Sequence, residues 1–439
     1  MKKGFVALLI FLAIVVLVSP AIVGRIAEKS MSENIEWTAN QSGEVSVTTE
    51  SFTRGWFSSA GQHRLELQDG DLLLVAQSLL GPLTADDLPV LVIDTKLDHG
   101  LIPISSMSRD KGSLAPGLGS AVSTMSIELA DGEVFVIPGT IYSEVGLGGE
   151  LRSLYELEAG SFEEGGTTAS WGDAKVNIKT DPGTGEAAFD GNIASVSIGD
   201  ALEVLSLGQL TFKGEQRPTK HGVNVGDVAV EMSGLSVVVG GVTTGGVESL
   251  SLSARSELDG DDINAVASMN AVIHELPQVG GVTLDMVFNM EGADAAALGR
   301  VQQALDNAGN NQDPIAAFAA MEQDVKQLFA SGFTFNFERL DVTLPSGTVS
   351  ARMLFDFGEE DPATFEWTTL LLSTQGSIDL SIPDAVVQML VQAEPNMAMA
   401  IGGGYLVKRG DAYELEAELK KGLLTVNGAP IPIPLGGLP

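Results

Sequence analysis

The residues able to perform acid–base or metal chemistry are few in this chain and widely spaced. The four histidines are His63, His99, His221 and His274. His99 has an adjacent carboxylate, Asp98, in the segment LDHGLIP. Adjacent residues of a strand point to opposite faces, so these two could form a dyad only where a turn brings them together. Gly100 and Pro103 suggest such a turn, and we interpret Asp98 and His99 as a structural cap, with a ligand-binding or catalytic role as the alternative.

Sequence motifs for known chemistries are also missing. The chain has no cysteine, which excludes thiolate nucleophiles, iron–sulfur clusters and cysteine zinc sites. It has no HExxH, GxSxG, Walker or GxGxxG motif. The densest acidic segment begins at Asp259, but Asn264 and Asn270 stand where a calcium loop needs Gly and Glu. We therefore predict no catalytic residue, no metal site, no cofactor and no enzymatic activity.

The charge balance limits the partners. The 439 residues include 58 acidic and 24 basic side chains, which gives a formal net charge of −34. So acidic a surface repels nucleic-acid phosphates and anionic headgroups, which argues against both as partners. The candidate partners are the membrane through the N-terminal anchor, an envelope protein, a lipid or a second copy of the chain, and no nucleic acid.

The N-terminus has the pattern of a membrane anchor. Lys2 and Lys3 precede an apolar run from Phe5 to Val23, which is long enough to span a bilayer. The positive-inside rule predicts a cytoplasmic tail at 1–3, a transmembrane anchor at 4–24 and an exported region at 25–439. A signal peptide cleaved after Ala21 is the alternative. The predicted location is the inner membrane, with a single pass and the bulk of the chain in the periplasm.

Alternation of apolar and polar residues dominates the exported region. It is clearest in VTLDMVFNM at 282–290, FTFNFE at 333–338 and VSARMLFDF at 349–357. Each segment predicts a strand with one buried and one solvated face, as in antiparallel sheets. The fold class is mainly β (α+β): an extended antiparallel sheet with a helical hairpin, plus one N-terminal transmembrane helix.

Helical patterns interrupt the strands in the C-terminal half. We predict a helical hairpin at about 293–331, with Asp313 as an N-cap and Gly332 as a stop. A shorter helix is predicted at Pro383–Glu394, and the chain closes on a hairpin at Leu423–Gly428.

The hairpin is expected to pack on the strand that follows it. Phe333, Phe335 and Phe337 form one apolar face of that strand, and the second helix carries its own apolar stripe. Covering both surfaces at once would satisfy both elements. Two arrangements remain open, a fixed core or a lid over an apolar groove.

An aromatic turn stands out near the N-terminus, in SFTRGWFSS. Gly55 lets the chain reverse, so Trp56 and Phe57 would cover the end of a sheet with Arg54 stacked or paired nearby. The structural interpretation is a packed hairpin end. The functional interpretation is an aromatic docking site for a partner, because exposed aromatics mark interfaces.

Together these segments resemble the YdgA-like family of Gram-negative envelope proteins, a bacterial domain of unknown function. The resemblance spans the chain and is sharpest at Arg54-Gly55-x-Phe57-Ser58-Ser59 and Asp98-His99-Gly100-x-x-Pro103. It implies an inner-membrane anchor and a periplasmic location, and it implies no reaction. The leading hypothesis is a non-catalytic binding or scaffold protein. The alternatives are a lipid- or hydrophobe-handling protein with a β groove, and, less favoured, a hydrolase built around Asp98 and His99.

Overall fold

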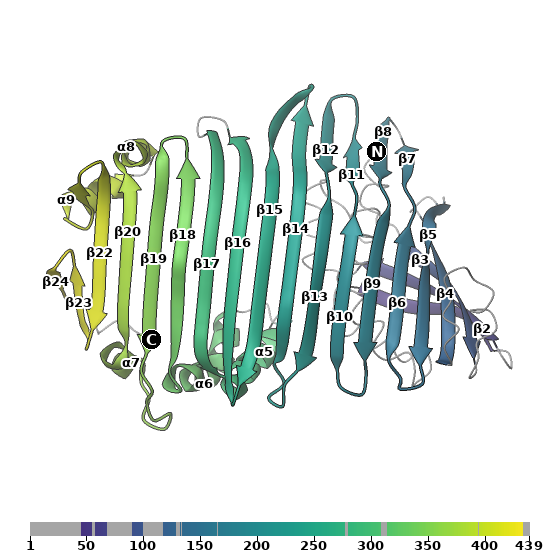
Figure 1. The fold of residues 1–439 in the computed structure, drawn as a ribbon, viewed down its shortest axis with the longest axis horizontal. Helices are drawn as coiled ribbons and strands as arrows, with labels where there is room; N and C mark the ends of the chain where they lie inside the picture. The colour runs from purple at the N-terminus through teal and green to yellow at the C-terminus, as the bar shows by residue number, and fades with distance from the viewer. Residues whose placement is uncertain are drawn as a thin grey trace. The chain divides into compact units, whose positions relative to one another are not determined.

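The computed structural model describes residues 45–54, 58–67, 90–99, 117–128, 132, 134–164, 166–276, 280–308, 314–393 and 395–432. These residues are mostly antiparallel β structure, as the alternation predicted (Figure 1). The chain divides into two compact units. Unit 1 contains residues 1–217 and 232–244, and unit 2 contains residues 218–231 and 245–439. The predicted transmembrane segment lies outside the described residues, and none of the described helices is long and apolar enough to span a membrane.

Unit 1 is built from short antiparallel strands. They are β1 (Val45–Arg54), β2 (Ser58–Leu67), β3 (Val90–His99), β4 (Gly117–Glu128), β5 (Val134–Gly146), β6 (Leu151–Leu157), β7 (Gly160–Glu164), β8 (Thr167–Trp171), β9 (Ala174–Asp181), β10 (Glu186–Ile193), β11 (Val196–Gly199), β12 (Glu203–Leu207) and β13 (Leu210–Pro218). One series pairs in the order β1-β2-β3-β4-β5-β6-β9-β10-β13. A second pairs β7-β8-β11-β12 and then the later part of β14 (Asn224–Val239).

A line of interruptions separates the two series. Two residues outside the ladder divide β6 from β7, β8 from β9, β10 from β11 and β12 from β13. The interruptions lie at the same level, because the amide of Gly172 donates to the carbonyl of Ser195, and the amide of Gly208 donates to that of Ser233. The interruptions leave the register continuous, since Leu157 pairs with Ala174 on one side and Gly160 with Trp171 on the other. They also need close backbone approach, since a Cβ on Gly208 would lie 2.6 Å from the Ser233 carbonyl oxygen.

The apolar face of unit 1 is well packed. Val145, Leu151, Val176 and Ile178 form a buried cluster, and Leu151 is only 1% exposed. The rings of Tyr155, Phe189 and Phe212 pack against this cluster. Phe212 also covers Gly191 on the neighbouring strand, where a side chain would find no room. This face is therefore the core of unit 1.

Unit 2 is an antiparallel meander with helices inserted between its strands. Its strands are β15 (Val242–Asp259), β16 (Asp262–Leu276), β17 (Gly280–Asp294), β18 (Phe333–Leu344), β19 (Gly347–Phe357), β20 (Gln375–Pro383), β21 (Val407–Arg409), β22 (Ala412–Lys420), β23 (Leu423–Val426) and β24 (Ala429–Ile431). Pairing runs β15-β16-β17-β18-β19-β20-β22-β23-β24, with β21 beside the start of β22. The predicted closing hairpin is confirmed, and Asn427 and Gly428 take the positive φ angles that its tight turn requires.

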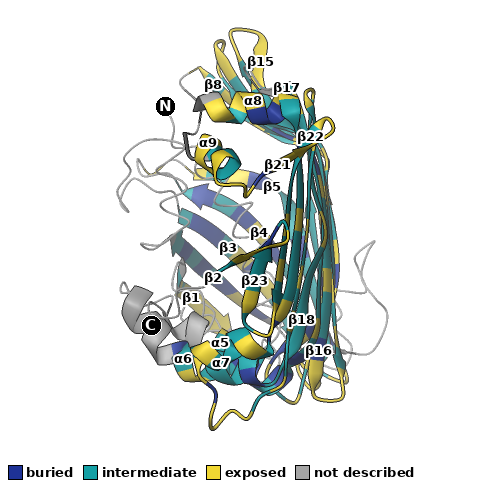
Figure 2. Cartoon of the chain, turned by 90° about the vertical axis from the view of Figure 1, so that its left-hand side faces the viewer, coloured by how far each residue is buried: buried dark blue, intermediate teal, exposed yellow. Residues whose placement is uncertain are grey.

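The helices lie at the two ends of these strands. The predicted hairpin is confirmed as α5 (Ala295–Ala308) and α6 (Pro314–Ala330), and the predicted shorter helix as α8 (Asp384–Ala393). The sequence reading missed α7 (Trp367–Ser373) and α9 (Pro395–Gly402). The strands alternate in direction, so α5, α6 and α7 follow or precede strands at one end of the sheet, and α8 and α9 lie at the other (Figures 1 and 2).

Local signals explain the helix ends. The Asp294 carboxylate accepts a hydrogen bond of 2.6 Å from the amide of Ala297 and so caps α5. Gly332 ends α6 with φ of 73°, as its position predicted. The expected cap of α6, Asp313, lies outside the described residues.

Gly208→Ala tests whether the line of interruptions depends on close backbone approach. We expect a loss of about 1–3 kcal/mol in the free energy of unfolding, because the new methyl group meets backbone that must shift. Gly245→Ala is the control, since a Cβ there has no atom within 4 Å. Denaturant unfolding midpoints compare the two variants, and equal midpoints would contradict this account of Gly208.

Candidate functional site

The apolar surface of unit 2 is one candidate for a binding site among the described residues. We call it the apolar face. It is formed by Phe288 and Met290 of β17, Phe333, Phe335 and Phe337 of β18, Met353, Phe355 and Phe357 of β19, Ile378 and Leu380 of β20, and Ala417 and Leu419 of β22. These residues lie in register across five neighbouring strands. Each of them is half-buried, and none reaches full burial.

Helices meet the apolar face at both ends of its strands. At one end, the Phe329 ring of α6 lies 5.4 Å from that of Phe333 and 5.0 Å from that of Phe357. At the other end, Val386 and Val387 of α8 are buried in a cluster with Ile382 and Leu406, which also takes in parts of β19 and β22. Figure 2 shows these helices on the same side of the strands.

In the middle of the apolar face, the described aromatic rings contact one another. Phe288 contacts Phe335 at 4.9 Å and Phe337 at 5.3 Å, and Phe335 contacts Phe337. The expectation that the hairpin packs on this face is therefore confirmed at its Phe333 end. Over the described side chains, the central rows remain partly open, as the groove arrangement requires.

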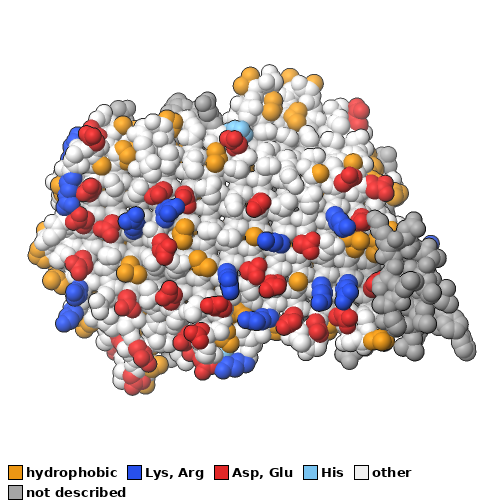
Figure 3. All heavy atoms as spheres, in the orientation of Figure 1, with side chains coloured by type: hydrophobic (Ala, Val, Ile, Leu, Met, Phe, Trp, Pro, Cys, Tyr) orange, Lys and Arg blue, Asp and Glu red, His pale blue; other side chains and the backbone are white. Residues whose placement is uncertain are grey.

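The opposite face of the same strands is polar. Arg339 donates to Asp285 at 3.0 Å, and this hydrogen bond raises the pKa of the guanidinium. Arg409 contacts both Glu414 and Glu416. Figure 3 shows acidic and basic side chains spread over this face. The described strands β17 to β22 therefore carry ion pairs on one face and the apolar face on the other.

The two segments that carry the family resemblance lie on adjacent strand ends of unit 1. Arg54 at the end of β1 pairs with Ser59 of β2, and Ser58 pairs with Asp98 of β3. The hairpin predicted around the aromatic turn is thus confirmed, while Trp56 and Phe57 lie outside the described residues. Asp98 is half-buried. His99 pairs with Gly119 in the ladder between β3 and β4.

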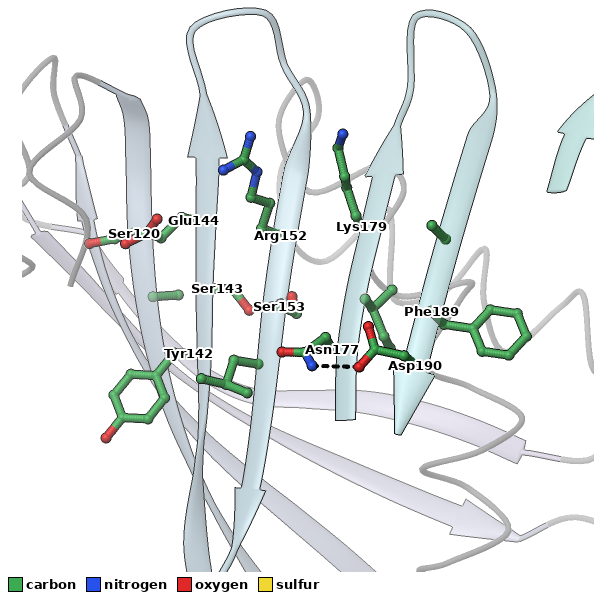
Figure 4. Close-up of a pocket in the computed structure, with 14 residues that line it drawn as sticks. Ser120, Tyr142, Ser143, Glu144, Arg152, Ser153, Asn177, Lys179, Phe189 and Asp190 are labelled. Carbon is green, nitrogen blue, oxygen red and sulfur yellow. Dashed lines mark hydrogen bonds between the residues drawn. The ribbon is translucent and has the colours of Figure 1, made fainter. Parts of the chain in front are cut away.

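The strand pairing extends from Asp98 into a polar row. Asp98 pairs with Ser120, Ser120 with Glu144, Glu144 with Arg152 and Arg152 with Lys179. The last four of these residues line a pocket of about 400 Å³ (Figure 4). Sequence reasoning missed this pocket, because its lining comes from five strands whose alignment depends on the register of several successive hairpins.

His63 is the most deeply buried titratable residue near the resemblance segments. It is 3% exposed, its Nδ1 lies 3.1 Å from the Thr49 hydroxyl, and its Nε2 has no hydrogen-bond partner among the described residues. Burial lowers the pKa of its imidazole, and the Asp94 carboxylate opposes that shift. Its position on the buried face of β2 makes it a core residue. No group of three or more potential ligands in the described part of the chain is arranged to hold a metal ion.

His63 predicts a loss of stability in mild acid. Its folded pKa lies below the unfolded value of about 6.5, so the unfolded chain binds a proton that the folded chain refuses. Stability should be fully present above that pH and fall as the pH decreases through the folded pKa. His63→Gln removes the imidazole that takes up this proton in the unfolded chain. The unfolding midpoint of this variant should therefore fall less between pH 7 and pH 5 than that of the wild type. An identical acid dependence would assign the loss to other groups.

Comparison with known proteins gives a family. The family described as "Bacterial protein of unknown function (DUF945)" matches residues 1–434, and the YdgA-like resemblance is consistent with it. No curated protein and no solved structure matches the chain.

Proposed function

We propose that this chain, which belongs to the DUF945 family of bacterial proteins of unknown function, is a non-catalytic envelope protein that binds acyl chains on its apolar face. The observation that carries the proposal is the apolar face itself, which has no fully buried residue in its central rows and is bordered by helices at both ends. A contiguous apolar surface that is left incompletely buried is a candidate binding site. The proposal combines two of the hypotheses drawn from the sequence, a non-catalytic binding protein and a lipid-handling protein with a β groove.

The helices favour a narrow ligand over a second sheet. Two sheets pack face to face at a spacing of roughly 10 Å, about the diameter of one helix. Helices α6 and α8 both contact the apolar face, so they obstruct the close approach of a flat sheet from a second copy. The β19 strand has 11 residues and spans roughly 36 Å, which leaves roughly 15 Å between helices at the two ends. An acyl chain fits within that space.

The chemistry of the face also favours a hydrocarbon. Its side chains are Phe, Met, Ile, Leu and Ala, which offer no hydrogen-bond donor or acceptor apart from the weak thioether. Burial of each methylene group contributes about 0.8 kcal/mol. Several methylene groups against these rows therefore suffice for binding, whereas a polar peptide would leave its backbone groups unpaired.

Phe335→Ala tests the apolar face. We expect a clear fall in co-purifying lipid and a loss of about 1–2 kcal/mol in the free energy of unfolding, because the ring is only half-buried. Leu354→Ala is the matched control, since Leu354 lies on the opposite face of β19 and is 42% exposed. Lipid is measured by mass spectrometry of extracts, and stability by denaturant unfolding.

Two other results would assign the face differently. A loss of about 3–5 kcal/mol with unchanged lipid would mean that another part of the chain fills the face as a core. A change from dimer to monomer in Phe335→Ala, without any lipid in the wild type, would mean that a second copy covers it.

We also propose the location that the N-terminal pattern predicts, a single-pass inner-membrane anchor with the bulk of the chain in the periplasm. Its support is the apolar run from Phe5 to Val23 behind two lysines. The full chain should remain in the membrane pellet after carbonate extraction. A mature form that begins near Ile22 and is recovered from the soluble periplasm would identify the segment as a cleaved signal peptide instead.

A further inference from the structure

The pocket of unit 1 lies on neighbouring strands and has a distinct charge arrangement. It has a volume of about 400 Å³ and is lined by residues of β4, β5, β6, β9 and β10. Figure 4 shows Arg152 and Lys179 extending in the same direction from adjacent strands, with Glu144 on the other side of Arg152. All of these residues belong to unit 1.

Arg152 and Lys179 are direct cross-strand neighbours. They pair in register between β6 and β9, so their side chains leave the same face of the sheet. Like charges placed directly opposite each other destabilise a sheet. In a chain with 58 acidic and 24 basic side chains, acidic partners are plentiful, so two adjacent cations need a specific explanation.

The carboxylates nearest to these cations lie beside Arg152. Glu144 pairs directly with Arg152 between β5 and β6, and Glu150 lies 3.9 Å from the guanidinium, whose side chain is 65% exposed. Lys179 forms no ion pair within the part of the chain that the structure describes. By contrast, Arg64 in the same unit lies within 4 Å of three carboxylates, those of Glu50, Glu66 and Glu128.

The rest of the lining offers acceptors and a free hydroxyl. Asn177 donates a 2.8 Å hydrogen bond to Asp190 and so orients that carboxylate beside the pocket. Ser120 is 2% exposed, and its Oγ has no hydrogen-bond partner among the described residues. Burying a hydroxyl without a hydrogen-bond partner costs free energy, so the unpaired Ser120 hydroxyl points to a partner that a ligand would supply.

We propose that this pocket binds a phosphate ester of a polyol, with its oxyanion held between Arg152 and Lys179. The guanidinium supplies two parallel donors to the phosphoryl oxygens, and the ammonium supplies a point charge. Glu144 and Asp190 would repel a second anionic group but accept hydrogen bonds from hydroxyl groups. The recognised chemistry is therefore one phosphoryl group beside hydroxyls, whether in a soluble ester or in a lipid headgroup.

Titration of the full-length protein in detergent with glycerol 3-phosphate tests this assignment. The wild type should bind, and the double variant Arg152→Gln/Lys179→Gln should bind at least about 100-fold more weakly, because each lost charged contact accounts for about tenfold or more. Lys175→Gln is the control, since this exposed lysine of β9 pairs with Glu156 at 3.8 Å. It removes one positive charge from the same strand, as Lys179→Gln does, and should change the affinity by less than about twofold.

Vesicle binding distinguishes the two sources of the phosphoryl group. Wild-type binding of glycerol 3-phosphate identifies a soluble ester. A lipid headgroup is identified if the wild type does not bind glycerol 3-phosphate but binds phosphatidylglycerol vesicles more strongly than phosphatidylcholine vesicles. The double variant should then lose this vesicle binding. The single variant Lys179→Gln repeats the comparison if the double variant does not fold. The proposal is overturned if the wild type binds neither probe, or if Lys175→Gln weakens binding as much as the pocket variants do.

Discussion

Antiparallel hydrogen bonding between neighbouring strands is the constraint on which the rest of this structure depends. The ladder satisfies the backbone and, because side chains alternate along each strand, it also fixes which residues share a face. In unit 2 this brings Phe288, Phe337, Met353, Ile378 and Ala417 into one row across five strands. A shift of one residue in any strand would send its apolar side chains to the ionic face. The bulge that places both Glu338 and Arg339 in solvent preserves this arrangement.

The two units use the same ladder with different results on their apolar faces. In unit 1, residues such as Leu151 and Ile178 are almost fully buried, at 1% and 3% exposure. The aromatic rings of Phe189 and Phe212 in unit 1 are half-buried, as are those of Phe335 and Phe355 in unit 2, but the apolar face of unit 2 has no fully buried residue beneath its rings. Full burial of a Phe side chain contributes about 1.5–3 kcal/mol, so the incompletely buried rows leave part of that free energy available to a ligand. This difference in coverage is why the apolar face of unit 2, rather than that of unit 1, is assigned to binding.

Local sequence signals predicted the parts of the fold that depend on neighbouring residues. The hairpin helices, the helix after β20, the Asn427–Gly428 turn and the alternating strands of unit 2 all agree with the structure, because periodicity and turn chemistry act within one or two elements. The Phe333, Phe335 and Phe337 face was predicted for the same reason. Whether anything covers it depends on side chains distant in sequence, so two arrangements remained open.

The polar pocket shows what such signals miss. Arg152 and Lys179 each occupy an ordinary solvent-facing position of an alternating strand, and neither is unusual in its own segment. They become neighbours because β6 with β7 and β8 with β9 form the two sides of one long hairpin, whose register continues from Gly160↔Trp171 to Leu157↔Ala174. The turn between β7 and β8 therefore fixes a register that places Arg152 opposite Lys179, more than ten residues from that turn.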